Sequence, residues 1–489
     1  MDLSLTNIAS VRYFIPELVL VAFAVAVILF DLVAKKRNSE RSAYLSLLGL
    51  VVAVIAVIAV GSEDRSLFLG MVRLDSFAMF FKIIISVAAA ATILFSIRSD
   101  ELDSQTKGEY YALLLAVTFG MFLMASSTHL LMIYLSLEMV SLTSYILAGF
   151  LTHSPRSSEA AFKYITYGAV SSGTMLFGIS LLFGMTGTGD VMLMSSKLTE
   201  MFSQGEAYPL AVLLSITFIL AGIGYKIASV PFHMWSPDVY EGAPIPVTAF
   251  LSVASKSAGF ALFIRFFYSG FKLVDASVDW SLMLAVVSAL TMTVGNLAAL
   301  PQQNVKRLLA YSSIAHGGYL LMGGVLLTSE GLQAILCYLI VYLFMNLGAF
   351  FVVILIANEV GSETIDGYRG LVARAPLVAV SMAIFLFSLT GLPPLAGFAG
   401  KWILFAAVIK EKLYWLAIIG LLNSVVSLYY YVRIVKAMFL ETSEDTESLS
   451  FSFGNRVLLA VFVIPTLLLG IYWNPLYQLS KLSLGKLMG

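Results

Sequence analysis

Five residues that can gain or lose a proton lie inside long apolar stretches of this sequence. They are Glu138, Lys226, Lys256, His316 and Lys401. Carboxylates, amines and imidazoles exchange protons with their surroundings, so this set could carry protons through an apolar layer. A charge at the centre of a bilayer costs about 3 kcal/mol. Each of these groups is therefore expected to face the protein interior and to meet a partner or water there.

The neighbours of two of these groups favour hydration. Serines lie four residues before both Lys256 and His316, and that spacing places them on the same helix face. A single buried charge can be a purely structural contact, but five of them on separate helices favour a proton path. Lys163 is a further candidate, because it follows Glu138 closely in the chain.

The elements that hold these residues are predicted to be membrane-spanning helices. Of the 489 residues, 60% are hydrophobic and 12% are charged, whereas a soluble domain carries roughly 25% charged residues. About 20 apolar residues cross the hydrocarbon core, and the chain has about fourteen such runs. They lie near 13–34, 42–60, 73–97, 109–126, 128–151, 159–184, 209–230, 243–268, 279–299, 304–327, 330–357, 374–409, 412–438 and 455–474. We expect an all-α polytopic protein, with a single membrane domain over residues 1–489.

The sequence also repeats itself at an offset of 174 residues. Tyr145–Gly149 lies over Tyr319–Gly323, and Tyr164 meets Tyr338 without a gap. Because the offset spans five helices, an odd number, the second copy is expected to be inverted, as in many transporters. The predicted parts are N-terminal helices over 1–108, a first repeat over 109–268, a second repeat over 279–438 and a last helix over 455–474.

Each repeat is expected to contain one broken helix. The first break is predicted at Pro231, and the second at Pro393 and Pro394. Proline removes a backbone donor and clashes with the preceding turn. Exposed backbone at membrane depth is tolerated only around water or protein, so breaks at matching places indicate the ion path.

Basic residues in the connections predict the orientation. Connections after odd-numbered spans hold more of them than the others: Lys35, Lys36, Arg37, Arg41, Arg98, Lys107, Arg156, Lys306, Arg307, Arg369, Arg374 and Arg456, against Arg65, Arg73, Lys197, Lys272, Lys410 and Lys412. The odd connections should face the cytoplasm and both termini the periplasm. The first apolar run has no basic segment before it, which favours a permanent span over a cleaved signal.

Several classes of function are not supported by the sequence. Lys+Arg and Asp+Glu are both 29, so no basic field exists to attract nucleic acid. The lone Cys337 and the scattered histidines offer no metal, haem or iron–sulfur ligand set. No glycine pattern matches a dinucleotide-binding fingerprint. We therefore expect neither a cofactor nor a metal in this chain, and no redox chemistry of its own.

Four motifs are similar to those of the antiporter-like subunits of NADH-quinone oxidoreductase (complex I). They are Ser136–Glu138, Lys226–Val247, Tyr311–His316 and Gly391–Gly397, and the resemblance covers nearly the whole chain. It implies that the carboxylate of Glu138 pairs with Lys226. It also implies that the path continues through Lys256 and His316 to Lys401.

The resemblance also implies partners and a location. One of three sister subunits usually has a carboxylate where this chain has Lys401, and another carries a long C-terminal lateral helix, which favours the third sister. The implied setting is the inner (plasma) membrane of a respiratory chain, beside other antiporter-like and small membrane subunits. The chain would then be part of a proton-pumping translocase. A subunit of an Mrp-type cation/proton antiporter is the alternative.

Overall fold

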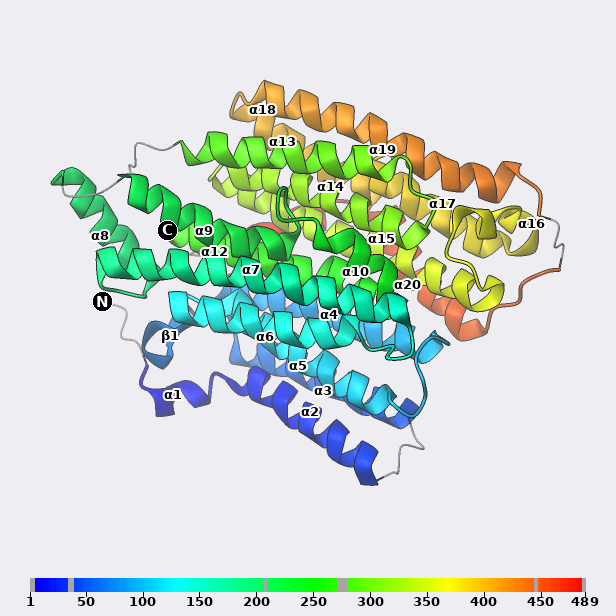
Figure 1. The fold of residues 1–489 in the computed structure, drawn as a ribbon, viewed down its shortest axis with the longest axis horizontal. Helices are drawn as coiled ribbons and strands as arrows, with labels where there is room; N and C mark the ends of the chain where they lie inside the picture. The colour runs from blue at the N-terminus through cyan, green and yellow to red at the C-terminus, as the bar shows by residue number, and fades with distance from the viewer. Residues whose placement is uncertain (1–4, 34–38, 206–208, 271–278, 444–446, 486–489) are drawn as a thin grey trace.

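The computed structural model describes residues 5–33, 39–205, 209–270, 279–443 and 447–485. Over these residues the chain is almost entirely helical, and its helices lie side by side along the long axis of the molecule (Figure 1). Four of the basic residues used above to predict orientation lie outside the described residues: Lys35, Lys36, Arg37 and Lys272.

The elements follow one another in this order: α1 (Asn7–Val11), α2 (Ile15–Val33), α3 (Ser39–Val60), β1 (Arg65–Leu67), η1 (Phe68–Gly70), β2 (Val72–Leu74), α4 (Ser76–Arg98), α5 (Lys107–Ser126), α6 (Leu130–Ala148), α7 (Pro155–Thr186), α8 (Val191–Ser203), α9 (Pro209–Ile227), α10 (Trp235–Gly242), α11 (Ile245–Phe250), η2 (Leu251–Ser255), α12 (Lys256–Gly270), α13 (Trp280–Ala299), α14 (Val305–Val325), α15 (Ser329–Val360), η3 (Ile365–Tyr368), α16 (Leu371–Arg374), α17 (Pro376–Thr390), α18 (Ala396–Lys410), α19 (Tyr414–Leu440), α20 (Phe453–Ile471) and α21 (Asn474–Leu484). The strands β1 and β2 form an antiparallel hairpin with Ser66 opposite Arg73. The segment η2 is a π-helix, and η1 and η3 are 3₁₀-helices.

The predicted spans correspond to helices of the described structure. Among the described residues, twelve helical segments are long and apolar enough to cross a membrane. The two other predicted spans are α14 and the interrupted pair of α17 and α18. The polytopic all-α fold is therefore confirmed.

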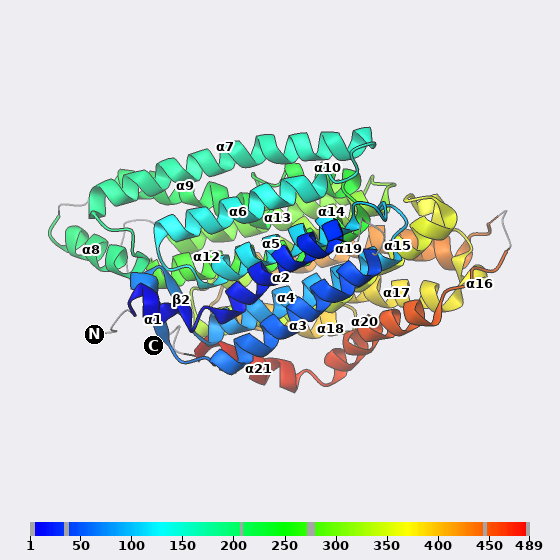
Figure 2. The same cartoon turned by 90° about the horizontal axis from the view of Figure 1, so that it is seen from below.

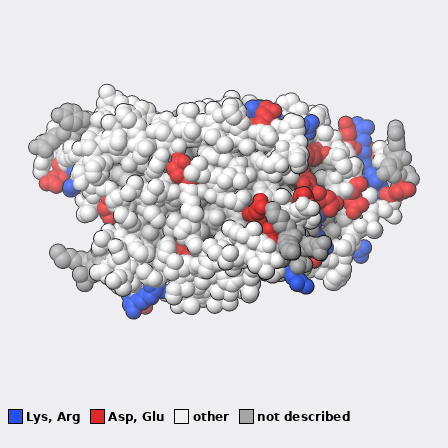
Figure 3. Space-filling view, turned by 60° about the horizontal axis from the view of Figure 1, so that its bottom comes forward, with Lys and Arg blue, Asp and Glu red and all other residues white. Residues whose placement is uncertain are grey.

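The charge distribution fits a protein embedded in a bilayer. In Figure 3 the Lys, Arg, Asp and Glu side chains gather mainly toward the two ends, with a largely uncharged band between them. In the most apolar stretches of α2, α3 and α20, only 22–33% of the residues are buried inside the bundle. In the corresponding stretch of Ile245–Tyr268, 100% of them are buried. The outer helices thus present apolar side chains outward, and α11, η2 and α12 form the centre.

The described ends of the chain meet at the same end of the bundle. The backbone N–H of Leu5 donates to the oxygen of Ser66 in the hairpin at 3.0 Å, and Gly485 lies against the Ser76 side chain, where α4 begins. Figure 2 shows α1 and α21 on that side of the molecule. An even number of spans produces this arrangement.

Two long helices have matching ends. The helices α7 and α15 each have 32 residues. Their first residues, Pro155 and Ser329, and their C-terminal glycines, Gly187 and Gly361, are each separated by 174 positions, the offset seen in the sequence. Both glycines adopt the left-handed conformation, with φ of 63° and 67°.

Helical geometry is interrupted near both sets of prolines. Between α9 and α10, residues 228–234 are not helical, and a second gap separates α17 from α18 at residues 391–395. In the first gap, Ser229 N–H donates to Gly224 O at 2.8 Å and Val230 N–H donates to Thr291 Oγ1 at 3.1 Å. At the second, Gly391 ends α17 with a φ of 92°. Side chains and turns therefore satisfy part of the backbone that the missing helical turns leave free.

Candidate functional site

Glu138 and Lys226 lie on neighbouring parts of the bundle but do not form an ion pair. Glu138 projects from the middle of α6, and Lys226 is the penultimate residue of α9. The carboxylate interacts electrostatically with the ammonium. Within the described residues, however, Lys226 Nζ and Glu138 Oε1 are buried atoms without a hydrogen-bond partner. The pair implied by the resemblance is thus open in this structure.

Lys256 sits at the centre of the bundle, where η2 ends and α12 begins. Its Nζ donates to the hydroxyl oxygen of Ser313 at 2.7 Å and also contacts that residue's carbonyl oxygen. Gly317, on the same helix as Ser313, faces both Lys256 Nζ and the carbonyl oxygen of Ile227. Because Ile227 directly follows Lys226, the end of α9 and the start of α12 meet at α14.

His316 lies on α14 between two lysines. It interacts electrostatically with both Lys256 and Lys401. Its Nδ1 is 2.6 Å from the hydroxyl of Tyr338, and its ring also lies 5.2 Å from that of Tyr342. A histidine that contacts phenol hydroxyls can exchange a proton along hydrogen bonds.

Lys401 lies in α18, just after the second break, and its ammonium is held by neutral oxygen atoms. Its Nζ donates to Thr390 O at 2.8 Å and to Ser424 Oγ at 3.0 Å, and it stands 4.3 Å from the ring centroid of Tyr319. A Cβ at Gly391 would lie 2.8 Å from Lys401 Cδ. Together with the positive φ, this close approach explains why glycine occupies position 391.

A cavity of about 480 Å³ opens beside Lys401. Polar atoms line it near Thr390 and Ser424, while Trp402 and Leu421 belong to its apolar wall. Both apolar residues are exposed on the outside of the bundle. Lys401 is therefore close to the lateral surface, whereas Lys256 is central.

Four of the five predicted groups form one continuous series. Lys226, Lys256, His316 and Lys401 are only 2–4% exposed. The end of α9 that carries Lys226 meets Lys256 at α14, and His316 interacts electrostatically with Lys256 and Lys401. The last step runs through Tyr319, whose hydroxyl is 2.9 Å from the Ser424 hydroxyl that also binds Lys401. Glu138 joins the series through its electrostatic interaction with Lys226.

Lys163 lies apart from this series. It is 35% exposed and pairs with Glu159 and Asp238, each at 2.7 Å. Asp238 also binds Arg307 at 2.6 Å. The structure therefore places Lys163 in an ion network joining α7, α10 and α14, and it shows no contact between Lys163 and Glu138 among the described residues.

The two lysines next to the breaks occupy different places relative to them. Lys226 comes just before the first break, and Lys401 comes after the second, inside α18. The repeat offset of 174 residues takes Lys226 to position 400, one away from Lys401, although the two lysines lie on opposite sides of their breaks.

Sequence reasoning missed three buried ion pairs. Their cation side chains are at most 4% exposed: Lys82 with Glu17 at 2.5 Å, Arg265 with Asp75 at 2.6 Å, and Lys306 with Glu363 at 2.9 Å. The signal was present for all three, since Lys82 and Arg265 lie within predicted spans and Lys306 lies at the start of another. Their partners are distant in sequence, which hides the pairing.

Pairing separates two classes of buried cation. Lys82, Arg265 and Lys306 each contact a carboxylate, whereas in the described structure Lys256 and Lys401 donate hydrogen bonds only to neutral oxygens. A carboxylate stabilises the charged form of an amine, and burial without one favours the neutral form. The second class is thus suited to releasing protons.

The comparisons with known proteins identify the family and the fold. The sequence model of the family described as NADH:quinone oxidoreductase/Mrp antiporter, TM, matches residues 127–427. A chain in the structure of respiratory complex I from Thermus thermophilus with bound aureothin is 30% identical, with a TM-score of 0.79 over 95% of this chain and 99% of that one. A chain of the Mrp complex from Dietzia sp. DQ12-45-1b has a TM-score of 0.80 at 21% identity over 98% of each chain, which shows a common fold.

Curated relatives show which subunit of this family the chain resembles. NADH-quinone oxidoreductase subunit N from Anaeromyxobacter sp. (strain Fw109-5) is 45% identical over 98% of this chain and 97% of the relative. Subunit N 2 from Sorangium cellulosum (strain So ce56) is 44% identical over 99% of both. Subunit N is also the third of the sister subunits weighed from sequence. On this full-length similarity, the chain belongs to the family of NADH-quinone oxidoreductase subunit N.

Proposed function

We propose that this chain conducts protons across the membrane as a subunit of a proton-pumping NADH-quinone oxidoreductase. Quinone reduction elsewhere in that complex would drive the transfer. The observation that carries the proposal is the buried series of Lys226, Lys256, His316 and Lys401. In the described structure, none of the three lysines of this series contacts a carboxylate. Such lysines can alternate between charged and neutral forms, and water among the nearby hydroxyls would carry the protons between them.

Glu138 and Lys226 would act as the switch at the start of the series. Opposite charges about 4 Å apart at an effective dielectric near 20 attract by roughly 4 kcal/mol. Moving one charge through 100 mV takes about 2.3 kcal/mol, so closing or opening this pair is of the required scale. When the pair closes, Lys226 holds its proton, and when the pair opens, as in this structure, the proton can pass to Lys256.

The proposal also covers location and partners. The subunit would lie in the cell inner membrane among other antiporter-like and small membrane subunits, with the connections after odd-numbered spans in the cytoplasm and both termini in the periplasm. The lone Cys337 is buried, which makes labelling of introduced cysteines simple. In spheroplasts, an impermeant maleimide should label Ser62→Cys and should not label Asp103→Cys until the cells are opened. The reverse labelling pattern would show that the orientation is opposite to the proposed one.

The pair can be tested in the assembled complex reconstituted into liposomes. Glu138→Ala and Lys226→Ala should each abolish NADH-driven proton pumping while the complex still assembles. Lys410→Ala is the matched control, because Lys410 is exposed and pairs only with the exposed Glu330. Normal pumping in either test variant would refute the switch.

The likeness to the Mrp complex leaves a second candidate, a subunit of a cation/proton antiporter. The full-length identity to subunit N relatives favours the oxidoreductase over it. Purification of the native assembly decides between the two. Flavin and iron–sulfur subunits should accompany this chain, and their absence would favour the antiporter.

A further inference from the structure

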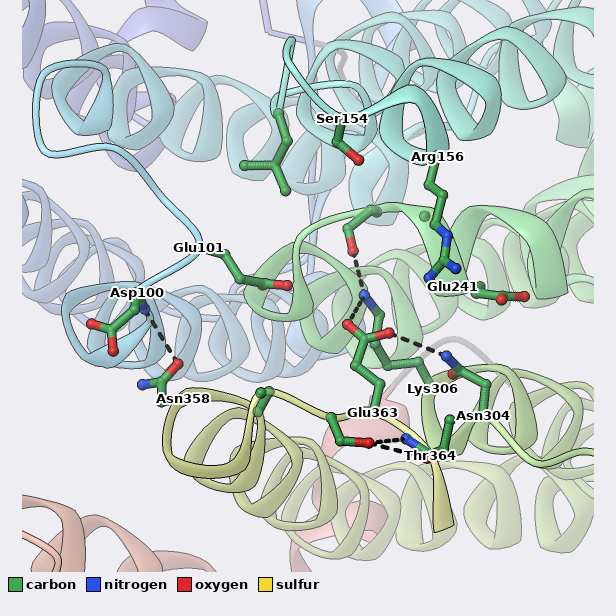
Figure 4. A pocket seen from close by; sticks show the side chains of 16 residues that line it. Asp100, Glu101, Ser154, Arg156, Glu241, Asn304, Lys306, Asn358, Glu363 and Thr364 are labelled. Atoms are coloured by element: carbon green, nitrogen blue, oxygen red, sulfur yellow. Dashed lines mark hydrogen bonds and ion pairs between the residues drawn. The ribbon is translucent and has the colours of Figure 1, made fainter. Parts of the chain in front are cut away.

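A polar cavity of about 570 Å³ opens at the end of the bundle opposite α1 and α21 (Figure 4). Five chain connections meet there: those between α4 and α5, α6 and α7, α10 and α11, α13 and α14, and α15 and η3. Four acidic and two basic residues line it: Asp100, Glu101, Glu241, Glu363, Arg156 and Lys306. We refer to it as the uptake cavity. Its excess of carboxylates attracts cations, including protons.

Glu101 lies at the floor of the uptake cavity. Its Oε2 accepts a hydrogen bond from the backbone N–H of Ile245, the first residue of α11, at 2.8 Å. Figure 4 shows its side chain pointing into the cavity, toward Lys306 and Glu363. Lys306 is already bound to Glu363 and to Ala243 O, both at 2.9 Å. Glu101 is thus the carboxylate that joins the cavity to α11.

A polar stripe leads inward from this floor to Lys256. Thr248, Ser252 and Lys256 follow one another at four-residue spacing through α11 and η2, so they share one face. All three are at most 2% exposed. From Ile245 to Lys256 the helix advances about 16 Å at roughly 1.5 Å per residue. The stripe therefore connects the uptake cavity with the central lysine.

Among the described residues, several buried polar atoms beside this stripe have no hydrogen-bond partner. Asn346 donates to Ser252 Oγ at 2.6 Å, but its own Oδ1 is unpaired, as are Ser255 Oγ and the Tyr342 hydroxyl. All three residues are at most 1% exposed. Because buried polar atoms are almost always hydrogen-bonded, these atoms require water. A chain of such waters would continue from the cavity to Lys256.

We propose that the uptake cavity supplies Lys256 with protons from one side of the membrane, and that Glu101 takes up each proton and passes it inward. The proton arrives from bulk water on the Glu101 carboxylate. It leaves along the waters at Thr248 and Ser252 and binds the neutral amine of Lys256, while Glu101 returns to its ionised form. This inference rests on the proposed function, because it assumes that Lys256 carries protons.

The electrostatics of Glu101 suit this role. Burial raises its pKa, the Lys306 ammonium and the bond from Ile245 lower it, and Glu363 raises it again, with a net upward shift. Asp100, Arg156 and Glu241 complete the charged surroundings. A carboxyl with a raised pKa holds a proton at pH values where an exposed glutamate is ionised, so it can serve as a loading site.

The test uses the complete complex in liposomes and compares Glu101→Gln with Glu101→Ala. Glutamine keeps an oxygen to accept the Ile245 N–H but cannot carry a proton, whereas alanine loses both functions. If Glu101 loads protons, both variants should pump more slowly by roughly tenfold or more. Asp103→Asn, in the same connection but exposed and outside the cavity, should pump normally.

Two further outcomes identify what has failed. Normal pumping by Glu101→Gln would overturn the inference, whether or not Glu101→Ala pumps. If only Glu101→Ala pumps slowly, Glu101 serves only to accept the hydrogen bond at the start of α11. Lys256→Ala in the same assay separates this failure from a wider one. If Lys256→Ala loses pumping while Glu101→Gln keeps it, the cavity assignment is wrong and the proposed function stands, and if both pump normally, the proposed function fails as well.

Discussion

At the level of single residues, the partner of a buried charge indicates its role better than its burial does. Lys82 and Lys256 are both buried lysines in spans, but Lys82 contacts Glu17 and Lys256 contacts only Ser313. Breaking a buried pair leaves an uncompensated charge and destabilises by about 3–5 kcal/mol. A buried ammonium without a carboxylate already carries much of this destabilisation, and the loss of its proton removes the uncompensated charge. This contrast separates structural lysines from candidate carriers.

The sequence could predict which residues to examine, but not how they are paired. Charges inside apolar runs identified Lys226, Lys256 and Lys401, because apolar length and charge are both visible along the chain. The Glu17–Lys82 pair joins α2 and α4, so its two members lie far apart in sequence. Only the packing of those helices brings them together. The open state of Glu138 and Lys226 was invisible for the same reason.

At the level of elements, the breaks position the lysines. Proline and glycine predicted where helices stop, since both act on the local backbone. The π-helix η2 before Lys256 had no such local signal; it packs against α4 and α15.

Gly391→Ala tests whether the second break positions Lys401. A side chain at φ 92° is strained by about 1–2 kcal/mol, and the new Cβ would push against Lys401 Cδ. Gly61→Ala is the matched control, with φ 79° and no atom within 4 Å of its added Cβ. Both variants should lose similar stability in thermal unfolding of the complex, but only Gly391→Ala should slow pumping. Equal pumping rates would show that Lys401 tolerates displacement.

At the level of the whole molecule, the series of carriers crosses the bundle rather than following one helix. It begins on α6 and α9, passes α12 and α14 at the centre and ends on α18 near the lateral surface. The uptake cavity adds a branch from one end of the bundle. A polytopic all-α fold was predictable, since hydrophobic length sets it. The route between them was not, because side chains from separate helices build it.

The central claim is that the unpaired lysines release protons during the cycle. Arginine keeps the positive charge and cannot deprotonate in proteins. The decisive measurement is therefore the ratio of protons pumped to NADH oxidised by the reconstituted complex carrying Lys226→Arg, Lys256→Arg or Lys401→Arg. Each should fail almost as badly as the corresponding alanine variant, while Lys82→Arg, which keeps its ion pair with Glu17, should pump normally. Normal ratios in the three unpaired variants would contradict the account, because lysines that serve only as fixed charges can be replaced by arginine.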